Sequence, residues 1–97
     1  MWRSEDGKIC IYIDENRQGK ASFEQNGGTT DCYFVSGYSY YAEVYSWEVT
    51  ETNMPTEETL YERWTYKKLK KDSFTIIVEQ TTFLTVGEEI SFYKVLE

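Results

Sequence analysis

Pairs of carboxylates are the first residues in this chain whose type and spacing could carry chemistry. Four pairs are adjacent in the sequence: Glu5-Asp6, Asp14-Glu15, Glu57-Glu58 and Glu88-Glu89. Two carboxylates serve glycoside hydrolysis when they face each other across a substrate, but neighbours on a strand point to opposite faces of a sheet. The pairs also lack the alternating acidic spacing of a calcium-binding loop. We therefore interpret them as solvated residues near turns.

Histidine is absent from the sequence, and with it the commonest general base and metal ligand. A histidine-dependent nucleophile and a cysteine–histidine zinc site are therefore excluded. The two cysteines, Cys10 and Cys32, form no Cys-x-x-Cys motif, and their strand-like surroundings fit either two reduced thiols or one cross-strand disulfide. Gly27-Gly28 is too short to cradle a phosphate. We expect a protein that is not an enzyme, with no catalytic residue, metal site or cofactor.

The composition describes one folded domain. The chain has 97 residues, of which 40% are hydrophobic and 28% charged, as in globular proteins large enough for a single core. No stretch reaches the roughly 18 apolar residues of a membrane span, and no charged and apolar leader opens the chain. We expect a soluble domain over residues 1–97, and its compartment and oligomeric state stay open.

Charge is distributed unevenly along the chain. The formal net charge of −7 argues against contact with nucleic acid phosphates or an anionic membrane. Between Ala21 and Glu62 there is no lysine or arginine, whereas eight acids occur: Glu24, Asp31, Glu43, Glu48, Glu51, Glu57, Glu58 and Glu62. The simpler interpretation is a solvated surface. The more specific one is an acidic patch for a basic protein partner.

The main structural signal is an alternation of apolar and polar residues with a period of two, which is typical of β-strands. It is seen over Lys8–Asp14, Lys20–Glu24, Asp31–Val35, the stretch from Tyr38 to Thr50, and the segments 74–79 and 90–93. Glycine-containing turns separate these segments. The strongest are Asn26-Gly27-Gly28 and a Gly87-Glu88 turn predicted between strands Leu84–Val86 and Glu89–Val95.

This pattern predicts a mainly β fold, a small antiparallel meander barrel of seven or eight short strands with at most one helix. The segment 56–71 leaves two interpretations open. Its acids come first and its bases last, with Leu60 and Trp64 four apart, as in an amphipathic helix. The neighbours Trp64-Thr65-Tyr66 favour a strand instead. With a helix here, the fold would be α+β, an antiparallel sheet with one helix.

Several passages resemble the small lipocalin-like domains of bacteria, which are calycin-type barrels. They are Trp2, Gly19–Phe23, Tyr45–Val49, the run from Trp64 to Ile76, and Ile90–Val95. The chain departs from true lipocalins because only Met1 precedes Trp2 where they carry Gly-x-Trp, and because they are markedly longer. The resemblance implies a meander barrel with an apolar pocket. It supplies no catalytic residue and names no ligand.

Aromatic residues make up 18% of the chain, which is more than a small core needs. Alternate residues of a strand face the same side, so Tyr45 should accompany Trp47, and Trp64 should accompany Tyr66. We predict a shallow aromatic pocket for a small apolar or amphipathic ligand, lined by Tyr45, Trp47, Trp64, Tyr66, Phe23 and Phe92. The alternative use of these rings is to fill a narrow barrel.

The rival function is an acidic protein-interaction module of the inhibitor, immunity or anti-defence type. Tyrosine and tryptophan are enriched at protein interfaces, and acidic surfaces attract basic partners. The residues expected to contact the partner are Tyr38, Tyr40, Tyr41, Glu43 and Glu48. The direction of the surplus tyrosines separates the two functions. Inward convergence favours the pocket, and an outward cluster near Tyr38–Tyr45 favours the partner.

Overall fold

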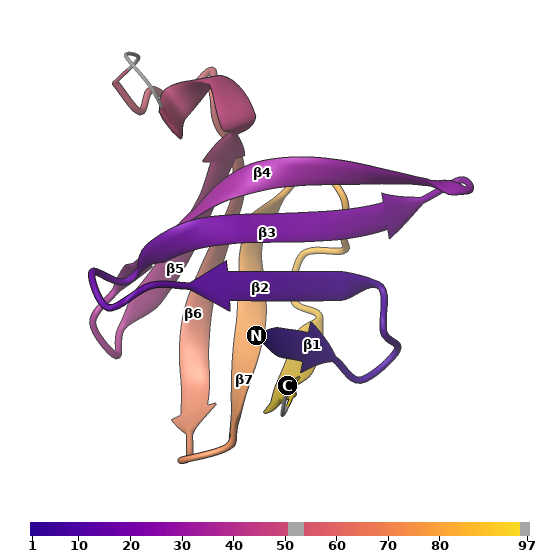
Figure 1. The fold of residues 1–97 in the computed structure, drawn as a ribbon, viewed down its shortest axis with the longest axis vertical. Helices are drawn as coiled ribbons and strands as arrows, with labels where there is room; N and C mark the ends of the chain where they lie inside the picture. The colour runs from indigo at the N-terminus through magenta and orange to yellow at the C-terminus, as the bar shows by residue number, and fades with distance from the viewer. Residues whose placement is uncertain (51–53, 96–97) are drawn as a thin grey trace.

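The computed structural model describes residues 1–50 and 54–95, which form a closed antiparallel barrel of eight strands (Figure 1). The strands are β1 (Trp2–Ser4), β2 (Ile9–Ile13), β3 (Gln18–Gln25), β4 (Gly28–Gly37), β5 (Tyr41–Ser46), β6 (Leu60–Leu69), β7 (Ser73–Thr81) and β8 (Glu89–Lys94). Each strand pairs with the next one along the chain, and β8 pairs with β1. The predicted meander barrel is therefore confirmed. Its one helical element in the described residues is the 3₁₀ helix η1 (Trp47–Thr50).

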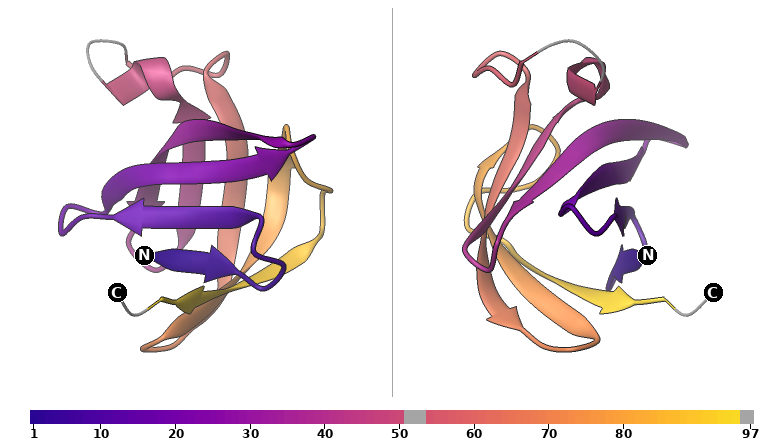
Figure 2. Two further views of the ribbon diagram at one scale, coloured as in Figure 1. Left: turned by 45° about the vertical axis from the view of Figure 1, so that its right-hand side comes forward. Right: turned by 60° about the vertical axis from the view of Figure 1, so that its left-hand side comes forward.

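The two halves of the meander cross each other steeply. Figure 2 shows β1 to β4 curving over the layer made by β5 to β8, with the two ends of the described chain close together. The β3–β4 hairpin turns at Asn26 and Gly27, whose φ angles of 48° and 81° are both left-handed. Such a two-residue turn matches the twist of the strands that it joins. The turn predicted at Asn26-Gly27-Gly28 is confirmed.

The segment 56–71 contains the strand β6 at Leu60–Leu69 and no helix, so the helical interpretation and the α+β alternative are wrong. The Thr59 amide donates to the Thr56 carbonyl at 3.1 Å in a short turn, and β6 then pairs with β5 on one side and β7 on the other. Bulges in the β6–β7 register follow Arg63 and Tyr66. Two-sided pairing satisfies the backbone polar groups of β6 while its apolar side chains enter the core.

Two other strand predictions were wrong. The long strand expected from Tyr38 to Thr50 is β5 alone, because the chain turns into η1 at Trp47. The strand expected at Leu84–Val86 belongs to the β7–β8 loop, in which Gly87 has a left-handed φ of 87°. Glu51, one of the eight acids counted in the sequence, lies outside the described residues.

Large side chains fill the barrel interior. The Trp64 ring lies 5.8 Å from the Phe92 ring and 6.2 Å from the rings of Phe23 and Phe34, measured between centroids. Small residues lie opposite the large ones in the strand pairs: Ala42 faces Trp64, and Gly19 faces Phe34. A narrow barrel packs in this way when large and small residues alternate across its wall. The interior is a packed core, so any ligand site lies at its ends or on its outside.

Candidate functional site at the barrel mouth

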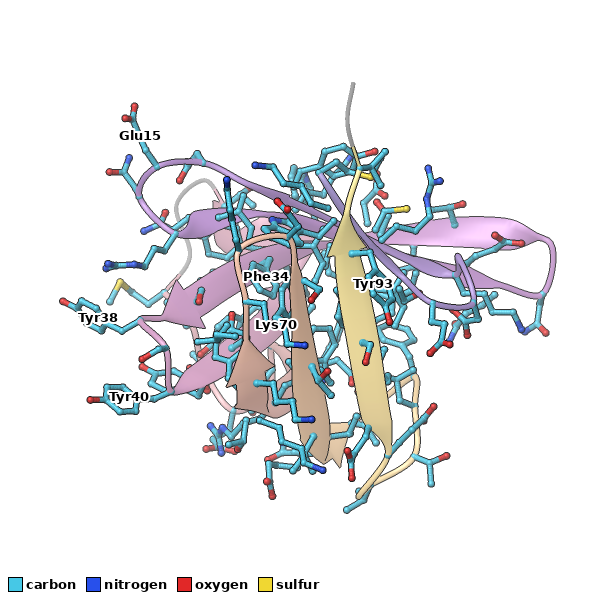
Figure 3. The ribbon with its side chains drawn as sticks, turned by 90° about the horizontal axis from the view of Figure 1, so that it is seen from below. Glu15, Phe34, Tyr38, Tyr40, Lys70 and Tyr93 are labelled. Atoms are coloured by element: carbon cyan, nitrogen blue, oxygen red, sulfur yellow. The ribbon has the colours of Figure 1, made fainter. Side chains whose placement is uncertain are left out.

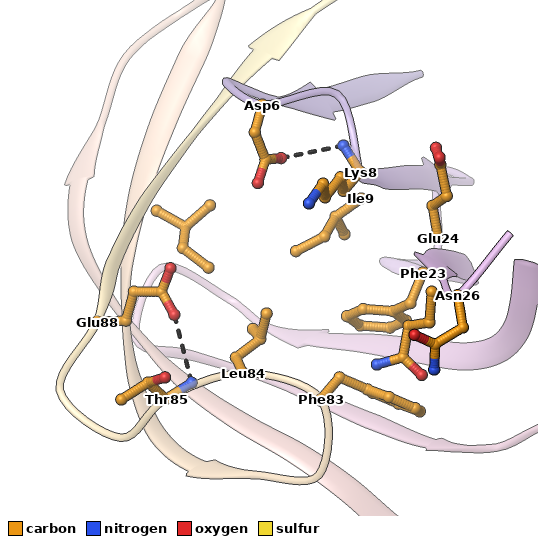
Figure 4. A pocket seen from close by; sticks show the side chains of 12 residues that line it. Asp6, Lys8, Ile9, Phe23, Glu24, Asn26, Phe83, Leu84, Thr85 and Glu88 are labelled. Atoms are coloured by element: carbon orange, nitrogen blue, oxygen red, sulfur yellow. Dashed lines mark hydrogen bonds between the residues drawn. The ribbon is translucent and has the colours of Figure 1, made fainter.

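A cavity of about 470 Å³ opens at one end of the barrel, which we call the mouth (Figure 4). Three connections form its walls, since they converge where the strands end. The residues come from the β1–β2 connection, the end of β3 with its turn, and the β7–β8 loop with the start of β8: Asp6, Lys8, Ile9, Phe23, Glu24, Gln25, Asn26, Phe83, Leu84, Thr85, Glu88 and Ile90.

The floor of the mouth is apolar and aromatic. The rings of Phe23 and Phe83 stack at a centroid distance of 4.6 Å and an angle of 24°, and Tyr61 meets Phe83 edge-on at 5.6 Å. Phe23 is 2% exposed and continues into the core through its contact with Trp64. In this stack Phe83 is the partly exposed ring, and buried Phe23 supports it from the core. The floor is therefore the upper layer of the core.

The rim of the mouth is polar and carries three acids and one base. The Asp6 carboxylate accepts hydrogen bonds from the Lys8 backbone N–H at 3.0 Å and from the Ser4 hydroxyl at 2.8 Å. These two bonds, the backbone one first, lower the pKa of Asp6 below its ordinary value. The Glu88 carboxylate accepts from the Thr85 N–H at 3.3 Å. An apolar floor inside a hydrogen-bonding rim suits an amphipathic molecule.

A buried carboxylate fixes one wall of the mouth. Glu62 on β6 is 0% exposed. Its Oε2 atom accepts from the Thr81 hydroxyl at 2.8 Å and from the backbone N–H groups of Thr82 at 2.7 Å and Phe83 at 2.9 Å, and its Oε1 atom accepts from Trp64 Nε1 at 3.1 Å. These donors replace the water that the carboxylate loses on burial. Glu62 thereby pulls the start of the β7–β8 loop over the core and holds Phe83 in place.

The six residues predicted to line a ligand pocket do not form one pocket, although Phe23, Trp64 and Phe92 pack together in the core. Phe23 alone borders the mouth, while Trp64 and Phe92 are 0% exposed within the core. Tyr45 lies on the outer face of β5, and Trp47, which begins η1, is 47% exposed.

The two tyrosines of that set have separate hydrogen-bonded environments. The Tyr66 hydroxyl is 2.7 Å from the Ser36 hydroxyl, and burial raises the pKa of Tyr66 above its ordinary value. Burial, and then a hydrogen bond with Glu43, raises the pKa of Tyr45 to about 12. Both side chains therefore keep their protons at neutral pH and act as hydrogen-bonding groups.

Sequence reasoning missed Phe83 and Leu84. Their signal was two adjacent large apolar residues just before the Thr85–Glu88 turn, but the alternation predicts a strand from Leu84 to Val86 and assigns Phe83 to no element. Glu62 was assigned to an acidic surface, and this was wrong because its side chain points into the barrel.

Three residues predicted to contact a partner form an outward cluster at the β4–β5 connection. Tyr38, Tyr40 and Tyr41 are 70%, 73% and 45% exposed, and Figure 3 shows Tyr38 and Tyr40 pointing away from the barrel. The Arg17 guanidinium lies 4.3 Å from the Tyr38 ring centroid. The two acids of the set have partners within the chain.

These acids are held by neighbouring side chains. Glu43 Oε2 accepts from Arg63 Nε at 3.0 Å and Nη2 at 2.9 Å, which raises the pKa of Arg63 further. The Glu48 carboxylate accepts from the Ser46 hydroxyl at 3.3 Å. The exposed cluster is thus mainly aromatic, and the acidic surface is less continuous than the sequence indicated.

Comparisons with family models, with curated proteins and with solved structures found no match. Within residues 1–50 and 54–95, no three or more His, Cys, Asp or Glu side chains gather as a metal site would require. No helix in that part of the chain has the length and apolar character needed to cross a membrane.

Proposed function

We propose that this barrel is a non-enzymatic, lipocalin-like domain that binds a small amphipathic ligand at its mouth. The observation that carries the proposal is the cavity of about 470 Å³ with stacked Phe23 and Phe83 beneath a polar rim. Ligand sites in proteins are typically concave, largely apolar and roughly 300 to 1,000 Å³ in size, with a few polar groups that orient the ligand.

The packed interior determines how such a ligand would lie. Trp64 and Phe92 fill the space that a larger barrel would leave for a ligand, so the apolar part of the molecule rests on the Phe23–Phe83 floor and its polar part meets the rim. Little ligand surface is enclosed in an open site of this shape. We expect affinity of order micromolar or weaker.

The test is an NMR titration of ¹⁵N-labelled protein with three probes that share one tail: hexanol, hexylamine and hexanoate. Backbone resonances of Ile9, Phe83 and Leu84 should shift and saturate with at least one of them. Phe83→Ala removes one ring of the floor and should weaken that probe at least about fivefold, or roughly 1 kcal/mol.

The matched control is Tyr93→Ala, which removes a ring of similar size that is 49% exposed on the outer face of β8 and does not line the mouth, and which should leave probe binding unchanged. Equal losses in both variants, or shifts that avoid the mouth altogether, would contradict the proposal.

A second candidate function, binding of a basic protein partner, is favoured by the outward tyrosines at the β4–β5 connection. Tyr38 and Tyr40 are the most exposed large side chains of that region, and exposed tyrosine is characteristic of protein interfaces. Replacing both with Ala should abolish binding to such a partner while leaving the fold intact, because neither ring contributes to the core.

A further inference from the structure

A row of four residues crosses the outer face of the sheet. Tyr12 on β2 lies directly opposite Lys20 on β3, Lys20 opposite Tyr33 on β4, and Tyr33 opposite Tyr45 on β5. Side chains opposite one another on one face of neighbouring strands are close enough to touch. The row therefore forms a strip of three tyrosine rings, with the Lys20 side chain between Tyr12 and Tyr33.

Trp47 turns this strip into a groove. Because η1 begins at the end of β5, Trp47 borders, together with residues of the strip, a hollow of about 450 Å³. We call this hollow the outer groove; it is lined mainly by Tyr12, Gln18, Gly19, Lys20, Tyr33 and Trp47. Tyr12 is 42% and Trp47 47% exposed, so both rings can be reached from solvent.

One backbone feature and one side-chain hydrogen bond define the shape of the groove. A Cβ atom at Gly19 would overlap the Tyr12 carbonyl oxygen, so this part of the wall stays bare backbone. The Tyr33 hydroxyl donates to Gln18 Oε1 at 2.6 Å and fixes the Tyr33 ring.

The chain's own cations show which chemistry this surface accommodates. The Lys20 ammonium lies 5.0 Å from the Tyr12 ring centroid, and the Arg17 guanidinium lies on Tyr38 beside the groove. Cations are attracted to aromatic faces, and tryptophan attracts them most strongly. Trp47 adds this strongest type of ring to the groove with nearly half of its surface open.

The charge around the groove also favours a cation. Asp14 lines it, Asp31 lies 3.9 Å from the Lys20 ammonium, and Glu48 follows Trp47 along η1. With Glu15 in the adjacent loop, the segments that border the groove carry these four carboxylates against the two cations Lys20 and Arg17, in a chain of net charge −7. A positively charged guest would be stabilised both by contact with the aromatic rings and by attraction to the surrounding carboxylates.

From these observations we infer that the outer groove docks a basic segment of a partner protein, whose Arg or Lys side chain lies against the exposed rings of Tyr12 and Trp47. The inference rests on the second candidate function and moves its central contact from the tyrosine cluster to the groove. The two surfaces adjoin, because the Ser36 N–H donates to the Arg17 carbonyl at 2.9 Å and so joins the β2–β3 loop to the end of β4.

The experiment uses the indole N–H signals of Trp47 and Trp64 as a local probe and an internal reference. The ¹⁵N-labelled protein is titrated with a blocked Gly-Arg-Gly-Arg-Gly peptide and, separately, with its Gly-Glu-Gly-Glu-Gly counterpart. The Trp47 signal and the Lys20 and Tyr33 amides should shift and saturate with the arginine peptide only. The Trp64 signal should stay unchanged, since that N–H donates to buried Glu62. The shifts should weaken as salt screens the field.

Two matched variants locate the contact. Tyr12→Ala removes a groove wall, and Tyr38→Ala removes a ring of the neighbouring cluster; both tyrosines are exposed and both lie under a cation of the chain. Tyr12→Ala should weaken the arginine peptide at least about threefold, and Tyr38→Ala should have less effect.

The opposite order would overturn the inference and leave the second candidate function standing. No shift at either surface would count against both. Equal shifts with the glutamate peptide would also overturn the inference, because they would show that the groove does not prefer a positively charged guest.

Discussion

Inside the barrel wall, Trp64 is 0% exposed and donates to a buried carboxylate, whereas on the outside Trp47 is 47% exposed and borders an open groove. Glutamate and cysteine show the same contrast. Glu62 is enclosed by hydrogen-bond donors, while Glu43 pairs with Arg63 at the surface. Cys32 is buried and Cys10 is partly exposed. The environment of each residue therefore depends on whether its side chain points into the barrel or out of it. The two tryptophans, two glutamates and two cysteines give three pairs of variants that test this contrast.

The tryptophan pair should show the largest difference. Trp64→Ala leaves a cavity among the core rings and removes a donor from Glu62, so we expect a loss of about 3–5 kcal/mol in the free energy of unfolding. Trp47→Ala should change it by less than about 0.5 kcal/mol. Urea unfolding followed by circular dichroism measures both. If Trp64→Ala does not fold, the milder Trp64→Phe should still cost more than Trp47→Ala; similar losses would break the contrast.

The glutamate pair should follow. In Glu62→Gln the amide has a single acceptor oxygen, so one of the present donors must face an NH₂ group, at a cost of about 1–3 kcal/mol. Amide exchange at Thr82 and Phe83 should also quicken, because the neutral amide oxygen that replaces Oε2 is a weaker acceptor for these N–H groups than a carboxylate. Glu43→Gln weakens only a partly exposed ion pair and should cost less than about 1 kcal/mol. Unchanged exchange at Thr82 in Glu62→Gln would show that the loop is held by something else.

The two cysteine variants should differ least in their free energy of unfolding at neutral pH, and they should differ more at alkaline pH. Burial, and then the charges of Asp31 and Glu62, raises the pKa of Cys32 from 9.0 to about 12. The unfolded chain therefore loses this proton first, and stability falls as pH rises from about 9 to about 12, by roughly 1 kcal/mol at pH 10.

The comparison of variants isolates this effect from the tyrosines that also titrate in alkali. Cys32→Ala should flatten the fall in stability between pH 8 and pH 10, whereas Cys10→Ala, which keeps Cys32, should retain it. In the folded wild type a thiol reagent should modify Cys10 well before Cys32. Equal slopes in the two variants would rule out the assigned cause.

The strands were predictable because alternation survives in most segments, and glycine and asparagine mark the turns between them. The buried face of β5 was not predictable. Tyr41 and Tyr45 share one face and Ala42 and Val44 the other, and both faces are apolar enough to be inside. The pairing of Ala42 with Trp64 decides the matter, since the Trp64 ring already packs against those of Phe23, Phe34 and Phe92 and the small side chain takes the inner position beside it. That information lies in another strand.

The mouth was largely beyond sequence reasoning for a related cause. Phe23 was found because it belongs to a regular strand, but Phe83 and Leu84 lie in a loop without alternation. Their positions depend on Glu62, about 20 residues earlier, whose side chain accepts the loop amides. A lone glutamate inside an apolar strand is a signal for such an anchor, and it was interpreted as surface charge because its neighbours in the sequence are acidic.

The pairing of β1 with β8 has a consequence for how the barrel assembles and fails. β1 has three residues, and they join Cys10 and Ile11 on one side to Phe92, Tyr93 and Lys94 on the other. This seam connects segments about ninety residues apart. Bringing them together costs the conformational entropy of the whole intervening chain before any hydrogen bond between β1 and β8 forms, so we expect the seam to form last. It should also part first under mild denaturation. The freed edges of β1 and β8 would then be templates for strands of another molecule, so early self-association of this protein should proceed through an open seam with most of the core still folded.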